Sequence, residues 1–399
     1  MIMYKKRKID VVVKYFFPVV AGIETNIVET YSVLAKRGWD VTIHTSKDVY
    51  KKKNVLASYE MIRGLRVKRY PFNVFGFFPD IDWQETDLVC LHNFDIFPHL
   101  RLFIHSLALM ILGKKKFALV LTPHGGFSLD TVWSIFPFWK RMIKKAYHNV
   151  FGTWLINHVV DGVRAVSEWE KEDMTAKGVR EELIAVIPNG VEDEAYEDVE
   201  KLASKEIKNK VKKWGKYIVR IGRIYPIKND ETIIKAMPLI PKDIKFVIVG
   251  PQELNQHKEY LDELRKLIKK LGLEDRVIFA GVIRGVDKYY VIRKSQTMTH
   301  MALWESFCNV VHEALSQGKV PIVANNTALP YLIKDQVNGY LVETKDYETL
   351  AKKIRYVIKN KKTKKLRDMA ERNRKFGLEE SWSRVAGKMG IFYKQLAGI

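Results

Sequence analysis

Residues 9–38 read IDVVVKYFFPVVAGIETNIVETYSVLAKRG, which contains a predicted strand, a loop and a helix in that order. The apolar run 9–15 is of the length and composition of a buried strand. A loop ending at Gly22 follows, and the apolar spacing predicts a helix over 25–37 that stops at Gly38. Because the run is continuous rather than alternating, we expect helices to cover both faces of the strand.

The same theme recurs along both halves of the chain. Further predicted strands lie at 40–46, 65–71, 86–92, 117–125, 162–167 and 184–190, and a second set lies at 217–223, 245–250, 276–281, 296–302, 319–324 and 339–343. Buried strands that alternate with helices indicate parallel sheets covered by helices. The predicted fold class is therefore α/β, with two doubly wound, Rossmann-like domains.

A highly charged stretch without strand candidates separates the two sets of strands. The 399 residues are enough for two separate cores. We expect an N-terminal domain over 1–192, a linker over 193–214 and a C-terminal domain over 215–377. Open α/β sheets bind ligands beyond the carboxyl ends of their strands, so a cleft between the two domains is the expected site.

The composition excludes several classes of protein. With 47% hydrophobic and 29% charged residues, the chain has an ordinary globular composition. Cys90 and Cys308 are too few for a disulfide framework or a thiolate metal cluster, which favours a reducing cytosol. The amino terminus resembles a signal peptide, but Lys14 and Pro18 interrupt its apolar run. No stretch reaches the ~20 apolar residues of a membrane span, and we expect a cytoplasmic location.

The charge favours a polyanionic partner. The chain has 68 Lys and Arg against 46 Asp and Glu, a formal net charge of +22. Nucleic acid, an anionic membrane surface and phosphorylated ligands all suit such a charge. No RNA-binding aromatic motif, zinc-finger spacing or helix-turn-helix pattern is present, so nucleic acid is not an expected partner.

Five residues that follow predicted strands are candidates for ligand binding. Gly22 would let backbone amides approach an anion at a helix N-terminus, although a single glycine between a strand and a helix is more often part of a plain turn. Gly222 ends a strand, and Arg223 and Lys228 follow it on a loop that suits a diphosphate; the alternative is two surface cations. His124 can hydrogen-bond a substrate hydroxyl, or be a buried histidine with satisfied bonds.

Residues 304–314, WESFCNVVHEA, place two glutamates about one short predicted helix. If that helix begins directly after Glu305, then Glu313 lies about 12 Å away along the axis. This exceeds the ~5 to 9.5 Å between paired catalytic carboxyls of glycoside hydrolases. The free amides of Phe307 and Cys308 suit a phosphate. Glu305, the two amides and Glu313 thus offer a hydroxyl acceptor, an anion site and a second hydroxyl acceptor in that order. A nucleotide sugar has its sugar, diphosphate and ribose in the same order. A capped helix with an apolar core face is the alternative.

Taken together, these motifs resemble those of the retaining GT-B glycosyltransferases of family 4. The resemblance is carried by ESFCNVVHE, GRIYPIKN, the HG of TPHGG, PNGV and ALSQGKVPIVA, which occur in the family's order over nearly the whole chain. It implies a GT-B architecture in which the two domains face a central cleft. Residues 378–399 are similar to the terminal helix that crosses back to the N-terminal domain in this family.

The resemblance also implies roles for single residues. Arg223 and Lys228 would hold the donor diphosphate and stabilise the leaving nucleotide, Glu305 would position the transferred sugar, and His124 would line the reacting face. The implied donor-binding residues are Gly22, Gly222, Phe307, Cys308 and Glu313, the last for the ribose hydroxyls. No metal and no other cofactor are implied. The sequence departs from the family at Cys308, where glycine is usual, which leaves the identity of the sugar open.

The predicted activity is retaining transfer of a hexose from a nucleotide-diphosphate sugar to a glycan or lipid-linked acceptor. The alternatives are a nucleotide-sugar epimerase of the same fold and a non-catalytic, polyanion- or membrane-binding GT-B protein. Residues 132–154 interleave aromatic and basic side chains, which suits a helix lying on an anionic membrane surface, at the inner face of the membrane. A core helix with a solvated basic face is the alternative for that segment.

Overall fold

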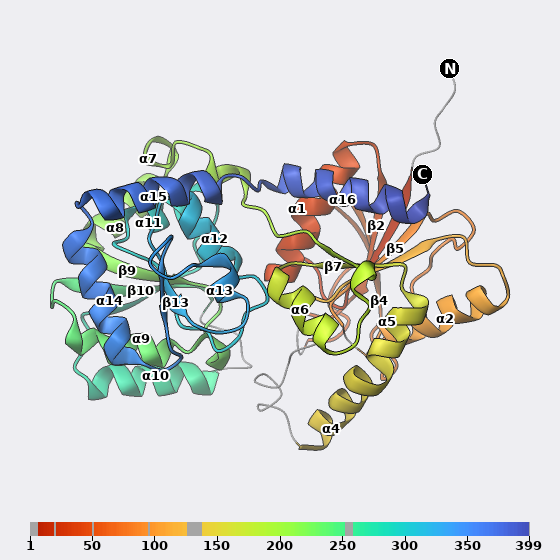
Figure 1. Cartoon of the computed structure of the whole chain (residues 1–399), viewed down its shortest axis with the longest axis horizontal. Helices are drawn as coiled ribbons and strands as arrows, with labels where there is room; N and C mark the ends of the chain where they lie inside the picture. The colour runs from red at the N-terminus through yellow and green to blue at the C-terminus, as the bar shows by residue number, and fades with distance from the viewer. Residues whose placement is uncertain are drawn as a thin grey trace. The chain divides into compact units, whose positions relative to one another are not determined.

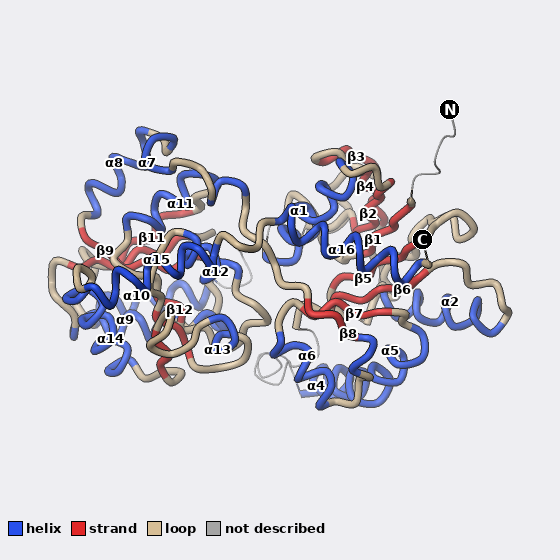
Figure 2. Tube along the Cα trace, turned by 45° about the horizontal axis from the view of Figure 1, so that its top comes forward, coloured by secondary structure: helices blue, strands red, loops and turns tan. Residues whose placement is uncertain are grey.

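The computed structural model describes residues 7–19, 21–49, 52–94, 96–125, 138–251 and 258–398. The chain forms two compact units, Met1–Asn189 with Trp382–Ile399, and Gly190–Ser381. Each unit is a largely parallel sheet with helices on its faces (Figures 1 and 2). The predicted α/β fold class is therefore confirmed.

The first unit contains an eight-stranded sheet in the order β3-β4-β2-β1-β5-β6-β7-β8. Its strands are β1 (Lys8–Val12), β2 (Asp40–Ser46), β3 (Tyr59–Ile62), β4 (Leu65–Tyr70), β5 (Leu88–His92), β6 (Ala118–Thr122), β7 (Gly162–Ala165) and β8 (Ile184–Val186). All neighbours are parallel except β3 and β4. The edge strand β3 was not predicted, because it is largely exposed and has no buried apolar run.

Successive residues of the central strands contribute to two different cores. Ile9 and Val11 belong to the cluster that packs against α1 (Gly22–Lys36) and α16 (Trp382–Ala397), whereas Val12 belongs to the cluster on the other face. Side chains of a strand alternate between the two faces of its sheet, so a strand covered on both faces must be apolar throughout. The other helices of this unit are α2 (His99–Ile111), α4 (Phe138–Ala146), the π-helical η1 (Tyr147–Gly152), α5 (Thr153–Val159), α6 (Glu168–Ala176) and the 3₁₀ turn η2 (Glu181–Leu183).

Among its described residues, the second unit has six parallel strands in two groups, β11-β10-β9 and β12-β13-β14. They are β9 (Lys216–Ile221), β10 (Ile244–Val249), β11 (Val277–Gly281), β12 (Thr299–His300), β13 (Ile322–Ala324) and β14 (Tyr340–Val342). A parallel bridge between Val219 and Met298 joins β9 to the segment before β12. The resulting order is that of doubly wound nucleotide-binding folds.

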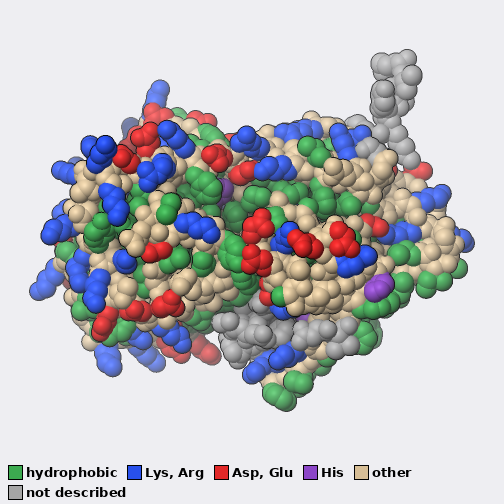
Figure 3. All heavy atoms as spheres, in the orientation of Figure 1, with side chains coloured by type: hydrophobic (Ala, Val, Ile, Leu, Met, Phe, Trp, Pro, Cys, Tyr) green, Lys and Arg blue, Asp and Glu red, His purple; other side chains and the backbone are tan. Residues whose placement is uncertain are grey.

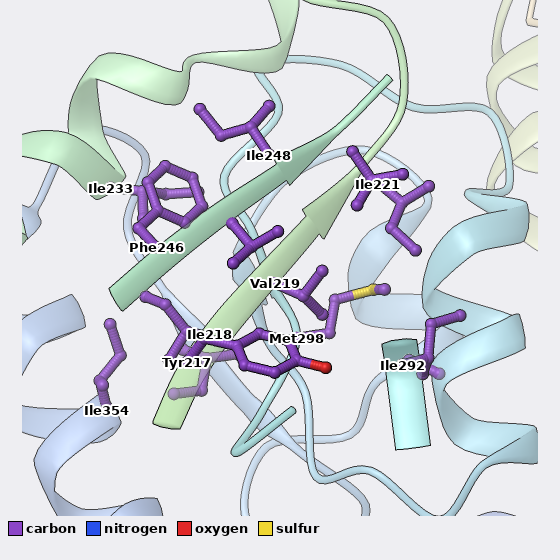
Figure 4. Close-up of a cluster of buried hydrophobic side chains, with 14 of the residues drawn as sticks. Tyr217, Ile218, Val219, Ile221, Ile233, Phe246, Ile248, Ile292, Met298 and Ile354 are labelled. Atoms are coloured by element: carbon purple, nitrogen blue, oxygen red, sulfur yellow. The ribbon is translucent and has the colours of Figure 1, made fainter. Parts of the chain in front are cut away.

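Helices cover both faces of this second sheet. They are α7 (Val199–Leu202), α8 (Lys205–Trp214), α9 (Asp230–Ala236), α10 (Lys258–Lys270), α11 (Gly285–Lys294), α12 (Asn309–Ser316), α13 (Leu329–Leu332), α14 (Tyr347–Asn360) and α15 (Lys364–Gly377), with 3₁₀ turns η3 (Asp193–Ala195), η4 (Pro226–Lys228) and η5 (Met237–Leu239). Figure 4 shows the core, in which side chains of β9 and β10 lie with Ile233, Ile292 and Ile354.

The stretch that sequence analysis expected as a linker, residues 193–214, is largely helical. It contains η3, α7 and α8, and Ile207, Val211 and Trp214 of α8 are buried in the core of the second unit. The apolar spacing within this charged stretch explains the difference, because it gives α8 one buried face. At the other end of the chain, α16 packs against α1 within the first unit.

Candidate active site

In the second unit, the chain reverses the direction of strand addition between β9 and β12, and most predicted site residues follow these two strands. Gly222 comes directly after β9 and has φ of +134°, a conformation that strongly favours glycine. Two hydrogen bonds tie the loop after β9 to the loop after β12: Leu303 N–H donates to Ile227 O (2.7 Å), and Asn229 Nδ2 donates to Met301 O (2.9 Å). The carboxyl ends at such a reversal are the usual ligand site of an open α/β sheet.

A buried ion pair that sequence analysis missed supports the loop after β9. Arg220 and Asp230 are fully buried, and Arg220 Nε lies 2.7 Å from Asp230 Oδ1. The same guanidinium donates to the carbonyl oxygens of Gly222 (2.5 Å) and Arg223 (2.8 Å). The Arg223 side chain is exposed, and in the described part of the chain no carboxylate pairs with it. Arg220 thus fixes the backbone from which the Arg223 cation projects.

Lys228 and Glu305 form an ion pair at the carboxyl ends of the strands of the second sheet. Lys228 Nζ lies 2.5 Å from Glu305 Oε1, and His300 Nε2 lies 2.7 Å from the same oxygen. The Glu305 backbone N–H donates to Thr327 Oγ1 at 3.0 Å. Burial alone would raise the pKa of Glu305, but Lys228 and His300 outweigh it and lower that pKa to about 2. Glu305 is therefore a carboxylate held in one position.

The same cluster contains metal-ligating atom types. His300, Glu305 and Cys308 each offer one donor atom, and these atoms lie within 4.8 Å of one another, the one such group among the described residues. The Lys228 ammonium already forms an ion pair with the Glu305 carboxylate, at 2.5 Å. A metal ion would have to displace this cation, so the arrangement fits an ion pair better than a metal centre.

The helix that bears Glu313 starts later than predicted. It begins at Asn309, and Cys308 is its N-cap, so Phe307 and Cys308 lie in the preceding loop. The reason is the backbone of Cys308, whose φ of +77° and ψ of +71° are left-handed and cannot belong to a right-handed helix. Within the described residues, the amides of Phe307 and Cys308 donate to no hydrogen bond. They stay available to an anion, but as loop amides.

The backbone of Cys308 has a conformation that is better suited to glycine. Glycine adopts a left-handed conformation without the steric cost that a Cβ atom causes. We expect Cys308→Gly to be more stable than Cys308→Ala by about 1 kcal/mol, because both lose the thiol and only alanine keeps the strain. Urea unfolding of the two variants measures this difference. Equal midpoints would contradict the assigned left-handed backbone.

Glu313 lies in a second buried ionic cluster that the sequence did not reveal. Lys288 Nζ lies 3.1 Å from Glu313 Oε1 and 2.7 Å from Glu192 Oε2. Burial raises the pKa of Glu313 to about 7 despite the Lys288 charge. Its other oxygen, Oε2, is buried and has no hydrogen-bond partner among the described residues. A buried acceptor without a donor costs free energy, so this oxygen is suited to a ligand hydroxyl.

Gly22 and His124 belong to the first unit. Gly22 is the first residue of α1, and a Cβ atom built there meets nothing within 4 Å, so neither its backbone nor its packing requires glycine. His124 follows β6 with a left-handed φ of +50°. Its Nε2 lies 2.9 Å from His92 Nδ1, and burial, followed by the charge of Arg164, lowers its pKa to about 3. The His124 ring is therefore neutral near pH 7.

The buried Arg164 holds the residues that lead into the PNG turn, at the end of the first unit. Arg164 is fully buried and donates to Ile187 O (3.0 Å), Pro188 O (3.1 Å) and Asn189 Oδ1 (3.1 Å). It also donates to Asn26 Oδ1 of α1 at 3.0 Å. Arg164 thus joins the turn to the first turns of α1, the helix that begins at Gly22.

Comparison with known proteins identifies the family. The family model "Glycosyl transferases group 1" matches residues 203–376, and the model "Glycosyltransferase Family 4" matches residues 20–195. The chain belongs to the group 1, family 4 glycosyltransferases. Both family matches lie over the sheets described above, and the resemblance seen in the sequence motifs is confirmed.

Individual relatives of this glycosyltransferase are distant but match most of the chain. An uncharacterized glycosyltransferase of Methanocaldococcus jannaschii is 25% identical over 383 residues, which cover 91% of this chain and 92% of that protein. Alpha-monoglucosyldiacylglycerol synthase of Streptococcus pneumoniae is 25% identical over 340 residues, covering 82% and 73%. The crystal structure of Anabaena HepE with UDP and glucose is 20% identical, covers 98% and 100%, and has a TM-score of 0.75, which establishes the GT-B fold.

The helices described give no membrane span. In the part of the chain that the structure describes, none of them is both long enough and apolar enough to cross a bilayer.

Proposed function

We propose that this glycosyltransferase transfers a hexose, with retention of anomeric configuration, from a nucleotide-diphosphate sugar to a glycan or lipid-linked acceptor. The observation that carries the proposal is the edge of the second sheet, where two cations, a fixed carboxylate and a buried acceptor oxygen follow the strand reversal. The HepE structure contains UDP and glucose, and the streptococcal relative is by name a glycolipid synthase.

In this proposal, each side chain binds one part of the donor. Arg223 and Lys228 pair with the diphosphate, and Lys228 exchanges part of its contact with Glu305 for phosphate oxygens. Glu305 then accepts hydrogen bonds from hydroxyls of the transferred sugar, and Glu313 Oε2 accepts one from the ribose. Gly222 leaves room for phosphate, and the Phe307 and Cys308 amides donate to it.

The proposed reaction needs no protein nucleophile. The acceptor hydroxyl attacks the anomeric carbon from the face that the diphosphate leaves, and a leaving phosphate oxygen takes the hydroxyl proton. The charge that develops on the departing diphosphate is stabilised by Lys228 and Arg223, which are already in place before the reaction. Residues that only bind charge at fixed positions suffice for such a step.

A panel of UDP-, GDP- and ADP-sugars, with and without added glycan or glycolipid acceptors, tests the proposal. We expect nucleotide release from one donor that depends on the acceptor, and a higher melting temperature with the matching nucleotide. Isomerised donor without acceptor would indicate an epimerase. Neither release nor a thermal shift with any nucleotide would contradict donor binding and favour a non-catalytic protein.

We also propose that α4 binds an anionic membrane surface, where a lipid-linked acceptor would lie. Phe138, Trp139, Met142 and Ile143 are all more than half exposed, and Arg141 and Lys145 are exposed on the same helix. Figure 3 shows hydrophobic and basic side chains together where α4 projects. A helix with one apolar face and one basic face is typical of a membrane interface. Residues 132–137 of the predicted membrane segment lie outside the described residues.

We expect the protein to sediment with vesicles that contain anionic lipid at low salt, and not with neutral vesicles. Arg141→Gln with Lys145→Gln should weaken this binding about 30-fold, because each basic residue near the surface contributes about 1 kcal/mol. The control is Lys359→Gln with Lys361→Gln in the second unit, which changes the net charge equally. Equal loss in both double variants would mean that overall charge, not α4, binds the vesicles.

A further inference from the structure

Four polar side chains form a continuous hydrogen-bonded chain inside the first unit. The Tyr393 hydroxyl of α16 lies 2.6 Å from the Tyr31 hydroxyl of α1, which lies 2.9 Å from His92 Nε2 at the end of β5. His92 Nδ1 lies 2.9 Å from His124 Nε2 after β6. Tyr393, Tyr31 and His92 are at most 1% exposed. The chain thus runs from the last helix to a predicted site residue.

The neighbours of this chain keep both imidazoles neutral. Burial lowers the pKa of His92 well below its usual value, and electrostatic interactions with His124 and Arg164 lower it further. Cys90 of β5 contacts both tyrosine hydroxyls, and burial raises the pKa of its thiol to about 12. No member of this hydrogen-bonded chain of side chains is therefore charged near pH 7. Each neutral imidazole donates from one ring nitrogen and accepts at the other, so the hydrogen bonds must all point in the same direction.

The acid strengths of the four groups favour one of the two possible directions. A phenol O–H is a stronger acid than a neutral imidazole N–H, and an imidazole nitrogen is a better acceptor than a phenol oxygen. Tyr31 O–H therefore donates to His92 Nε2 and accepts from Tyr393 O–H. His92 then has its proton on Nδ1 and donates it to His124 Nε2. Because His124 Nε2 accepts this hydrogen bond, the proton of the neutral His124 ring must be on Nδ1. This nitrogen does not contact His92, so it can donate to a ligand.

The backbone about His124 is also held in place. Its φ of +50° is sparsely populated for residues other than glycine, and such conformations persist only where surrounding contacts maintain them. The next residue, Gly125, donates its N–H to the carboxylate of Glu170, a buried residue of α6 that also accepts from Val166 N–H. Both the backbone and the ring of His124 are thus fixed by residues remote in sequence.

We propose that Tyr31, His92 and Tyr393 are positioning residues that hold His124 in its Nδ1-protonated tautomer, as a neutral hydrogen-bond donor to an oxygen of the substrate. The oxygen can be a sugar hydroxyl or a phosphate oxygen, because both accept from an N–H. The assignment of a substrate to His124 rests on the proposed function. The tautomer itself is a property of the protein without ligand.

Nitrogen NMR of histidine labelled with ¹⁵N tests the tautomer, since long-range spectra distinguish a protonated ring nitrogen from a bare one. The His92 and His124 signals are assigned with His92→Gln and His124→Gln. We expect a protonated Nδ1 and a bare Nε2 at His124, and a mixture of tautomers in Tyr31→Phe, which removes one hydroxyl and keeps the ring. The control is Tyr217→Phe, which removes a buried hydroxyl that donates to Val291 O in the second unit. A bare Nδ1, or unchanged populations in Tyr31→Phe, would overturn the proposal.

Kinetics of the same variants test the role of the network in the reaction. We expect Tyr31→Phe to lower kcat about 10-fold with little change in KM for the donor, a loss typical of outer partners that orient a ligand-binding histidine. Tyr217→Phe should keep kcat. A changed tautomer with unchanged kcat would remove the role in the reaction. If the wild-type protein turns over no nucleotide sugar, the proposed function fails, while the NMR result still decides the tautomer.

Discussion

Replacing Glu305 with Gln is expected to lower the turnover of the glycosyltransferase by about 10²- to 10³-fold, the usual cost of losing one fixed electrostatic group at a reacting centre. Glutamine keeps the shape of the side chain but loses the carboxylate that contacts Lys228 and His300. The sugar would then lose its charged acceptor. Initial rates with the donor that the sugar panel identifies measure this effect.

The loss should be confined to the sugar step and spare nucleotide binding. In Glu305→Gln the Lys228 ammonium no longer has a carboxylate at 2.5 Å, so it is freer to pair with phosphate. We therefore expect UDP, or the nucleotide that binds, to stabilise the variant at least as much as the wild type. The control is Glu206→Gln, which breaks an exposed pair with Lys210 on α8 and should leave turnover unchanged. Near-normal turnover of Glu305→Gln would refute the role of this carboxylate.

Much of the fold could be predicted because its signal is local. Continuous apolar runs mark strands that are covered on both faces, and each predicted run overlaps a strand of the structure. The edge strand β3 lacks that signal because its side chains are largely exposed. The helix start at Asn309 was missed because the left-handed conformation of Cys308 has no sequence mark when the residue is not glycine.

The candidate site was only partly predictable, for a different reason. Strand ends can be predicted from the sequence, and three of the site residues, Arg223, Lys228 and Glu305, follow such ends. The residues that support the site were not predictable in this way: Arg220, below Arg223, and Lys288, the partner of Glu313, are charged side chains inside a strand and a helix, where sequence alone suggests exposure. Only the tertiary structure shows that Arg220 pairs with buried Asp230. His300 was not predicted either, because it lies inside the predicted strand 296–302, whereas the observed strand β12 ends at this residue.

Replacing Lys288 with Met is expected to lower the free energy of unfolding by about 3–5 kcal/mol at pH 7.5, because it leaves the carboxylates of Glu313 and Glu192 without their shared cation. The Lys288 and Glu313 side chains are only 11% and 10% exposed, so water cannot replace the ammonium. Urea unfolding measures the loss. The control is Lys294→Met on the same helix, whose pair with Glu200 is 38% and 45% exposed and contributes at most about 1 kcal/mol.

The pH dependence of the Lys288→Met variant has a definite sign. Without the ammonium, the pKa of Glu313 in the folded protein rises above the value of about 7 that burial already causes. The folded variant then binds more protons than the unfolded chain, so its stability increases as the pH falls from 7.5 toward 5. The difference from the wild type should shrink over this range. A difference that is constant with pH would mean that lost packing, not charge, destabilises the variant.

A double variant separates the structural role of this cluster from its proposed role in binding. Lys288→Met with Glu313→Gln removes the cation together with one of its carboxylates, so most of the lost stability should return. Nucleotide affinity should be below that of the wild type, because glutamine lacks the second carboxylate oxygen proposed to accept from the ribose. Wild-type affinity together with restored stability would contradict the assignment of Glu313 Oε2 to a ligand hydroxyl. Recovery of stability alone supports it, since a purely structural glutamate would leave the affinity unchanged.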